Sequence, residues 1–230
     1  MNTVFLICTA HAEVGKVNAY ELHQLLERIN PDVAFLEVPA TWGYLQIIKH
    51  TGLESIALSS YREAHSVTLV PVDLPTPPAS FFENSKYLFN YIERVSDKYC
   101  RLMDENKINM TTEGFPYLNS DLHDHIQLEI HGEILRILEM RGDLSLTNAY
   151  EAWRRQDDLR EREMISNIEK CGRERKFDRA VLLVGAAHRS SIVRKSSERF
   201  SAGIVDVHWD YSSCFCERLR DGDASWDGAT

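Results

Sequence analysis

The first forty residues contain an apolar run, an amphipathic stretch and a second apolar run, and this order constrains the fold more than any other feature. The apolar runs, Met1 to Ala10 and Asp32 to Val38, have the length and composition of buried strands. Between them, leucine and isoleucine recur at helical spacing from Asn18 to Ile29, and Asn30-Pro31 ends that helix. Strand, helix and strand in this order form a βαβ unit with parallel strands and a right-handed crossover. The pattern therefore predicts an α/β fold around a mixed or mostly parallel central sheet flanked by helices.

The same alternation returns further along the chain. A third strand is predicted from Ser66 to Val72, where it reaches Asp73. Near the end of the chain, a strand from Ala180 to Val184 precedes a helix from Arg189 to Phe200 and a strand near Gly203 to His208. Both halves of the chain therefore contribute strands to one sheet.

A different kind of sequence separates these halves. Leu74-Pro75-Thr76-Pro77-Pro78 is a rigid linker, and it opens a long, charged region with helical periodicity. Helices are predicted over Phe81 to Lys107, Asp121 to Met140 and Tyr150 to Cys171. We interpret residues 1–230 as a single α/β domain with a mostly helical insertion, or cap, at approximately residues 75–175.

Charge and composition exclude several classes of partner. The formal net charge is -9 and the pI is about 5.5, which argues against bulk binding to nucleic acid or to an anionic membrane surface. No apolar run has the length of a membrane span, and the first residues lack the basic region of a signal peptide. The five cysteines are odd in number and scattered, as is typical of a reducing compartment. We expect a cytoplasmic protein with neither nucleic acid nor membrane as a partner.

Two histidines each follow an apolar run and a turn of small residues. His11 ends Cys8-Thr9-Ala10-His11, and His188 ends Gly185-Ala186-Ala187-His188. In a parallel sheet both turns would lie at the carboxyl edge, where open α/β sheets bind their ligands. The alternative is that each is an ordinary loop histidine, which is the commoner role of a lone histidine after a strand.

Acidic residues follow the predicted strands in the same way. Glu37 lies inside an apolar strand, where a carboxylate needs a cation, a hydrogen-bond donor or a proton. Glu13 follows His11 closely, and Asp73 ends the third strand. His11, Glu37 and His188 together would form a nitrogen and oxygen ligand set for Zn²⁺, Mn²⁺ or Fe²⁺. No local motif such as His-Glu-x-x-His supports a metal independently.

Four short motifs follow one another along the chain: Thr9-Ala10-His11, the strand Pro31-Asp32-Val33-Ala34-Phe35-Leu36-Glu37, Arg160-Glu161-Arg162-Glu163-Met164, and Gly185-Ala186-Ala187-His188. In this order they resemble the motifs of the superfamily that contains TraB/PrgY, Tiki, ChaN and erythromycin-esterase-like proteins. The chain departs from some members at Cys8, where they have a glycine. The four motifs span most of the chain, including the helical middle.

The resemblance implies a site and roles for its residues. His11, Glu37 and His188 would line it, and Arg160 and Glu161 would enter from a helix. Arg160 could stabilise an oxyanion, and Glu161 or Glu13 could act as a general base. Without the resemblance, the charged stretch that contains Arg160 and Glu161 is interpreted as a solvated helix face.

The superfamily is functionally mixed, and a shared fold does not decide among its activities. The resemblance favours a hydrolase that acts on an ester or amide bond of a small molecule or peptide, with a divalent metal as the expected cofactor. The alternative is a non-catalytic or regulatory protein that binds a small molecule or haem in the same cleft. A lyase or transferase of secondary metabolism is a further alternative, and a homodimer is left open.

Overall fold

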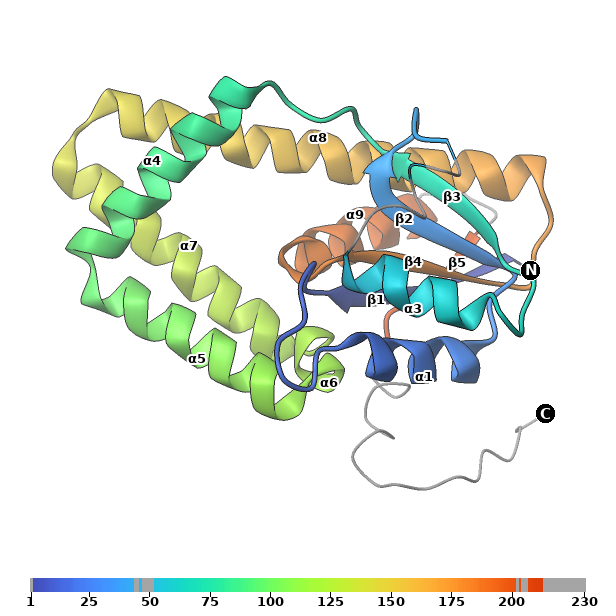
Figure 1. Cartoon of the computed structure of the whole chain (residues 1–230). Helices are drawn as coiled ribbons and strands as arrows, with labels where there is room; N and C mark the ends of the chain where they lie inside the picture. The colour runs from blue at the N-terminus through green and yellow to red at the C-terminus, as the bar shows by residue number, and fades with distance from the viewer. Residues whose placement is uncertain (1, 44–45, 47–51, 202, 204–206, 213–230) are drawn as a thin grey trace.

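Five parallel strands form the centre of the molecule (Figure 1). The computed structural model describes residues 2–43, 46, 52–201, 203 and 207–212. The strands are β1 (Asn2–Thr9), β2 (Val33–Pro39), β3 (Thr68–Asp73), β4 (Arg179–Gly185) and β5 (Val207–Asp210). Their order across the sheet is β3-β2-β4-β1-β5, so β4 lies between the first two strands of the chain. The predicted α/β class is confirmed, and every strand pairing in the described residues is parallel.

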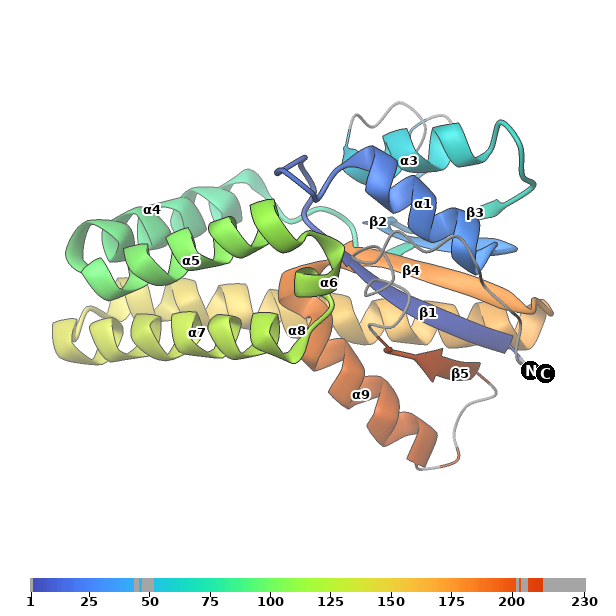
Figure 2. The same cartoon turned by 90° about the horizontal axis from the view of Figure 1, so that it is seen from below.

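Helices cover both faces of this sheet (Figure 2). Helices α1 (Ala19–Ile29) and α3 (Leu53–Tyr61) lie on one face and pack on each other. The later half of α8 (Leu144–Glu174) and all of α9 (Arg189–Ser201) lie on the other face. Because helices cover both faces, the inner strands β2, β4 and β1 are mostly buried, as is usual for parallel sheets, whereas the edge strands β3 and β5 have exposed positions.

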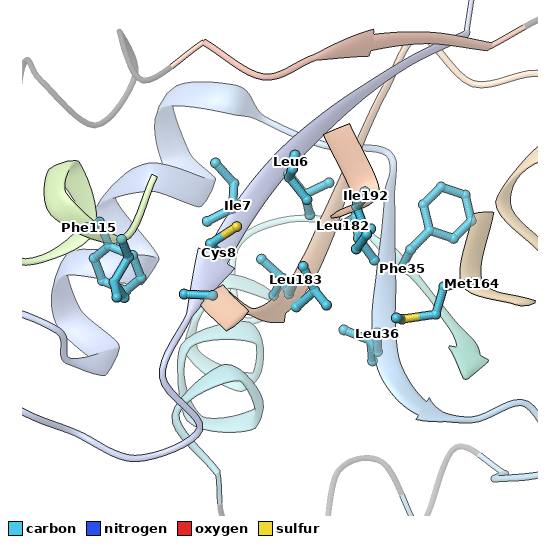
Figure 3. Close-up of a cluster of buried hydrophobic side chains, with 14 of the residues drawn as sticks. Leu6, Ile7, Cys8, Phe35, Leu36, Phe115, Met164, Leu182, Leu183 and Ile192 are labelled. Carbon is cyan, nitrogen blue, oxygen red and sulfur yellow. The ribbon is translucent and has the colours of Figure 1, made fainter. Parts of the chain in front are cut away.

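The apolar runs form the core. Residues 4–8 of β1 and 180–184 of β4 are almost fully buried. In Figure 3, Leu182 of β4 lies beside Ile192 of α9, and Leu36 of β2 lies beside Met164 of α8. Helix α1 buries Leu22, Leu25, Leu26 and Ile29 on one stripe. Fully burying each such side chain contributes about 1.5–3 kcal/mol of transfer free energy. This continuous core holds the strand ends in fixed positions.

A group of helices extends beyond the carboxyl edge of the sheet (Figures 1 and 2). It consists of α4 (Ala79–Val95), α5 (Asp97–Glu113), α6 (Phe115–Leu118), α7 (Asp121–Arg141) and the first part of α8, and we call residues 79–155 the helical arm. The helix predicted from Phe81 to Lys107 is divided at Ser96. The Ser96 hydroxyl accepts a hydrogen bond from the Tyr99 N–H and caps α5, a role that competes with helix continuation.

The prediction for the last strand differs in detail from the structure. The last strand runs over Val207–Asp210, slightly later than the predicted Gly203 to His208, and residues 204–206 lie outside the described part. The sequence also predicts a helix from Trp42 to His50, and most of that stretch lies outside the described residues. None of the described helices is both long enough and apolar enough to cross a membrane.

Candidate functional site

The strand order brings the two histidine turns together. Strands β1 and β4 are neighbours, and Thr9 pairs with Gly185 at their carboxyl ends. His11 lies two residues after β1, and His188 lies three residues after β4. Glu37 reaches the same place from β2, which pairs with the other side of β4. Residues from three separate parts of the sequence therefore meet at one edge of the sheet.

The Glu37 carboxylate is the centre of this cluster. Its Oε2 accepts a 2.6 Å hydrogen bond from the Gly185 N–H, and its Oε1 accepts a hydrogen bond from Arg160. The Nε2 atom of His11 lies 3.6 Å from Oε2, and the Nε2 atom of His188 lies 3.5 Å from Oε1. Burial disfavours the charge, but the bond to His188 and the nearby positive charges outweigh it and lower the pKa of Glu37 to about 2. Glu37 is thus a buried anion held by several donors.

Gly185 is required by the close approach of these groups. A Cβ atom at this position would lie 2.8 Å from Nε2 of His11 and 3.4 Å from Oε2 of Glu37. Any larger residue would displace the imidazole. The glycine of the sequence Gly185-Ala186-Ala187-His188 therefore makes room for the other histidine.

His188 is enclosed by carboxylates. Its Nδ1 atom lies 2.8 Å from Oε1 of Glu161, whose Oε2 accepts 2.5 Å hydrogen bonds from Ser191 and Lys195. Burial lowers the pKa of His188, but the hydrogen bonds to Glu161 and Glu37 outweigh it and raise that pKa to about 10. His188 is therefore a buried cation between two anions.

Arg160 is a second fixed cation. Its Nε and Nη2 atoms donate to Oδ2 of Asp73 at 3.0 and 2.7 Å, and Nη2 also donates to Glu37. Its Nη1 lies 3.9 Å from Asp157. Burial opposes the guanidinium charge, but Asp73 and Glu37 outweigh it and raise the pKa of Arg160. Arg160 therefore joins the end of β3 to the end of β2.

His11 is the exposed member of the cluster, since 62% of its side chain is accessible to solvent. Its Nδ1 atom lies 3.4 Å from Oε1 of Glu54, which also accepts a hydrogen bond from the Thr9 hydroxyl. The hydrogen bond to Glu54 raises the pKa of His11 despite partial burial, and the charge of Glu37 adds to this. Carboxylates thus face both ring nitrogens.

A pocket opens beside His11 and contains about 410 Å³ of empty space, including the open solvent at its mouth. Glu37 and Glu54 line it together with apolar side chains of β2, β4 and α3. The lining residues are His11, Leu36, Glu37, Val38, Glu54, Ser55, Leu58 and Leu183. The pocket therefore places apolar side chains and two carboxylates next to the imidazole.

The structure groups five of the six candidate residues: His11, Glu37, Arg160, Glu161 and His188. The sixth, Glu13, has a different place, because its Oε1 accepts a 3.0 Å hydrogen bond from the Ala19 N–H at the start of α1. Sequence reasoning missed Glu54, and it noted Asp73 merely as the residue at which a strand ends. Glu54 sits in the first turn of an ordinary helix, where no pattern marks it.

The expected metal ligands do not fit a metal in this arrangement. Glu37 already accepts from Arg160 and Gly185, and each ring nitrogen of His188 faces a carboxylate. A ligating histidine must instead be neutral and offer a free lone pair. Among the residues that the structure describes, no three His, Cys, Asp or Glu side chains are grouped as a metal site. The divalent metal stays a prediction from the sequence.

Comparisons with known proteins add little. No protein-family model and no curated protein matches this chain. Among solved structures, the chain is similar to a crystal structure of a Bacillus cereus protein, with a TM-score of 0.33 and 10% identity over 86% of this chain. The chain spans 64% of the length of that protein. At this TM-score the likeness supports no conclusion about fold or function.

Proposed function

We propose that this protein is a hydrolase that cleaves an ester or amide bond of a small molecule or peptide, with His11 as general base. One observation carries the proposal: His11 is exposed at a pocket, with Glu54 at its Nδ1 and Glu37 near its Nε2. An imidazole oriented by a carboxylate is a common device for proton transfer in acyl transfer reactions.

The proposed reaction begins with a water molecule in the pocket. The Nδ1–H of His11 donates to Glu54, which leaves the Nε2 lone pair to take a proton from the water. The resulting hydroxide attacks the carbonyl carbon, and the imidazolium then gives its proton to the departing alcohol or amine as the carbon–heteroatom bond breaks. Glu37 stabilises the imidazolium, since its charge lies 3.6 Å from Nε2.

The buried residues of the cluster hold the Glu37 carboxylate, which stabilises the imidazolium. Arg160 and His188 are positive charges that hold Glu37 ionised and in place. Glu161 and Lys195 continue the network away from the pocket. In this proposal these residues position Glu37, and His11 meets the substrate.

A screen of chromogenic esters and aminoacyl or peptidyl amides, with the purified full chain, tests the proposal. For any substrate found, we expect His11→Ala to lower kcat by about 10²–10⁴-fold, which is the usual contribution of a general base. The matched control is His125→Ala, an exposed histidine on α7 in the helical arm. Equal activity of His11→Ala and the wild type on that substrate would refute the assignment.

The screen also separates the remaining candidates. Zinc, manganese or iron that copurifies at one atom per chain, together with activity lost to a chelator, would support the predicted metal-assisted reaction. A Soret band on titration with hemin that disappears in His11→Ala would support haem binding. Binding of small molecules without any turnover would support the non-catalytic alternative.

A further inference from the structure

The root of the helical arm, residues 119–124, contacts both histidine turns. Asn119 follows α6 and bonds to Cys8, three residues before His11. Asp124 lies in the first turn of α7 and bonds to Arg189, the residue after His188. This short segment of the arm therefore contacts the chain near each histidine, through Asn119 at Cys8 and through Asp124 at Arg189.

Asn119 takes the place of a neighbouring strand. Strand β5 pairs with β1 from Asn2 to Phe5, so Cys8 lies beyond the paired part of that edge. The side-chain amide of Asn119 fills this place: Oδ1 accepts a 2.8 Å hydrogen bond from the Cys8 N–H, and Nδ2 donates to the Cys8 carbonyl at 3.3 Å. Nδ2 also donates to the Phe115 carbonyl at 3.0 Å, and Asn119 is 3% exposed. A buried side-chain amide that makes three hydrogen bonds holds the backbone of Cys8 in a single position.

Glu54, in the first turn of α3, holds the same turn from the opposite side. The Thr9 hydroxyl and the Nδ1 atom of His11 both face its Oε1 atom. The chain from Cys8 to His11 is thus fixed by Asn119 at the backbone and by Glu54 at the side chains. Releasing one contact allows the turn to move relative to Glu37.

Asp124 has the matching place at the second turn. Its Oδ2 atom accepts a hydrogen bond from Nη1 of Arg189, a side chain that is 9% exposed. Asp121 lies 3.5 Å from the same nitrogen and is fully exposed. The free energy of a partly buried ion pair depends more on its geometry than that of an exposed pair does. Asp124 therefore joins α7 to the start of α9, directly beside His188.

We propose that Asn119 and Asp124 are positioning residues through which the helical arm sets the places of His11 and His188 around Glu37. The kinetic consequence rests on the proposed function, whereas the structural one does not. Displacement of a catalytic group by about 1 Å can reduce a rate by about 10²-fold. The Nε2 atoms of His11 and His188 lie 3.6 and 3.5 Å from the carboxylate oxygens of Glu37, so a small shift of either turn changes one of these distances.

The test uses the full chain with Asn119→Leu, Asn119→Asp and Asp124→Asn. Asn119→Asp keeps the acceptor for the Cys8 N–H and removes both donated bonds, so a folded variant remains if Asn119→Leu fails to fold. Ser85→Ala and Asp104→Asn are the matched controls: they lie on α4 and α5 in the arm, and Ser85 is a buried polar residue whose hydroxyl donates to the Phe81 carbonyl. Amide hydrogen exchange of residues 5–12 and 186–191 is measured in every variant.

We expect exchange to rise at least tenfold in residues 5–12 for the Asn119 variants and in residues 186–191 for Asp124→Asn. The controls should leave both segments unchanged. Exchange that stays at the wild-type rate in both segments of the folded variants would overturn the inference, whatever the activity of the protein.

On any substrate found by the screen, the same variants should lower kcat about tenfold with little change in KM, whereas the controls leave kcat unchanged. A KM effect with unchanged kcat would overturn the kinetic part of the inference. Faster local exchange in a protein that hydrolyses nothing would refute the proposed function and leave the positioning contacts supported.

Discussion

The two histidine turns share a sequence pattern and a place at the sheet edge, yet their environments are opposite. The side chain of His11 is 62% exposed, whereas that of His188 is 7% exposed. His11 faces a pocket and is held by one helix residue, Glu54. His188 is enclosed by Glu37 and Glu161, and Lys195 and Ser191 support Glu161 from behind.

Because their exposure differs, the two histidines have different chemical roles. A buried imidazolium between two carboxylates neutralises charge and cannot meet a substrate without rearrangement. An exposed imidazole between carboxylates can exchange protons with a bound molecule. Substitutions that change one histidine turn at a time therefore separate the two roles.

The largest expected effect on stability is that of His188→Ala. Removing this cation takes one buried partner from each of Glu37 and Glu161, and breaking a buried ion pair typically costs about 3–5 kcal/mol. His11→Ala should change the free energy of unfolding by less than about 0.5 kcal/mol, as is usual for exposed positions. Urea denaturation of both variants measures the difference, and equal losses would contradict the comparison.

The next largest effect is on the pH dependence of the free energy of unfolding, which should follow the titration of His188. Its pKa is raised from 6.5 to about 10, so its stabilisation is complete below pH 6.5 and is lost as the pH rises through 10. The pKa of Glu37 is lowered from 4.5 to about 2, so its contribution is present above pH 4.5 and is lost as the pH falls through 2.

We therefore expect the free energy of unfolding to fall between pH 6.5 and pH 10, with a smaller fall in His188→Gln. The control, His125→Gln, should follow the wild-type curve. If the curves of His188→Gln and the wild type have the same slope in this range, His188 is not a buried cation.

Gly185→Ala changes the space between the two turns. The added methyl would lie 2.8 Å from Nε2 of His11, and because that ring is exposed it can move away at a cost of about 1–3 kcal/mol. Activity should fall about tenfold, since a shifted catalytic group loses rate. Gly132→Ala on α7 is the control: its added methyl meets nothing within 4 Å and should stabilise the helix by about 0.5–1 kcal/mol. Unchanged activity in Gly185→Ala would contradict the assignment of His11 as the general base.

The smallest effect belongs to Glu13, which lies close to His11 in sequence but outside the cluster. Its carboxylate caps the start of α1, so Glu13→Ala should cost about 1 kcal/mol of stability and leave kcat unchanged. Thermal unfolding and initial rates measure the two quantities. A large fall in kcat would restore Glu13 as a candidate base.

The strand ends were predictable because local patterns encode them. Continuous apolar runs predict buried strands, and residues that follow parallel strands must share one edge, which places His11, Glu37 and His188 near one another. The order of the strands was not predictable, since nothing local indicates that β4 lies between β1 and β2. Glu54, Lys195 and Asn119 act through contacts across the fold, and each occupies an unremarkable helix or turn position in the sequence.

The division between the two histidines is tested most directly by diethyl pyrocarbonate modification of the folded protein, with peptide mapping at each time point. We expect His11 to be modified early while His188 stays unmodified until the protein unfolds. Activity, once a substrate is known, should fall in proportion to the modified fraction of His11. Early modification of His188 would show that its imidazole is not enclosed, and full activity after His11 is modified would show that His11 is not the general base.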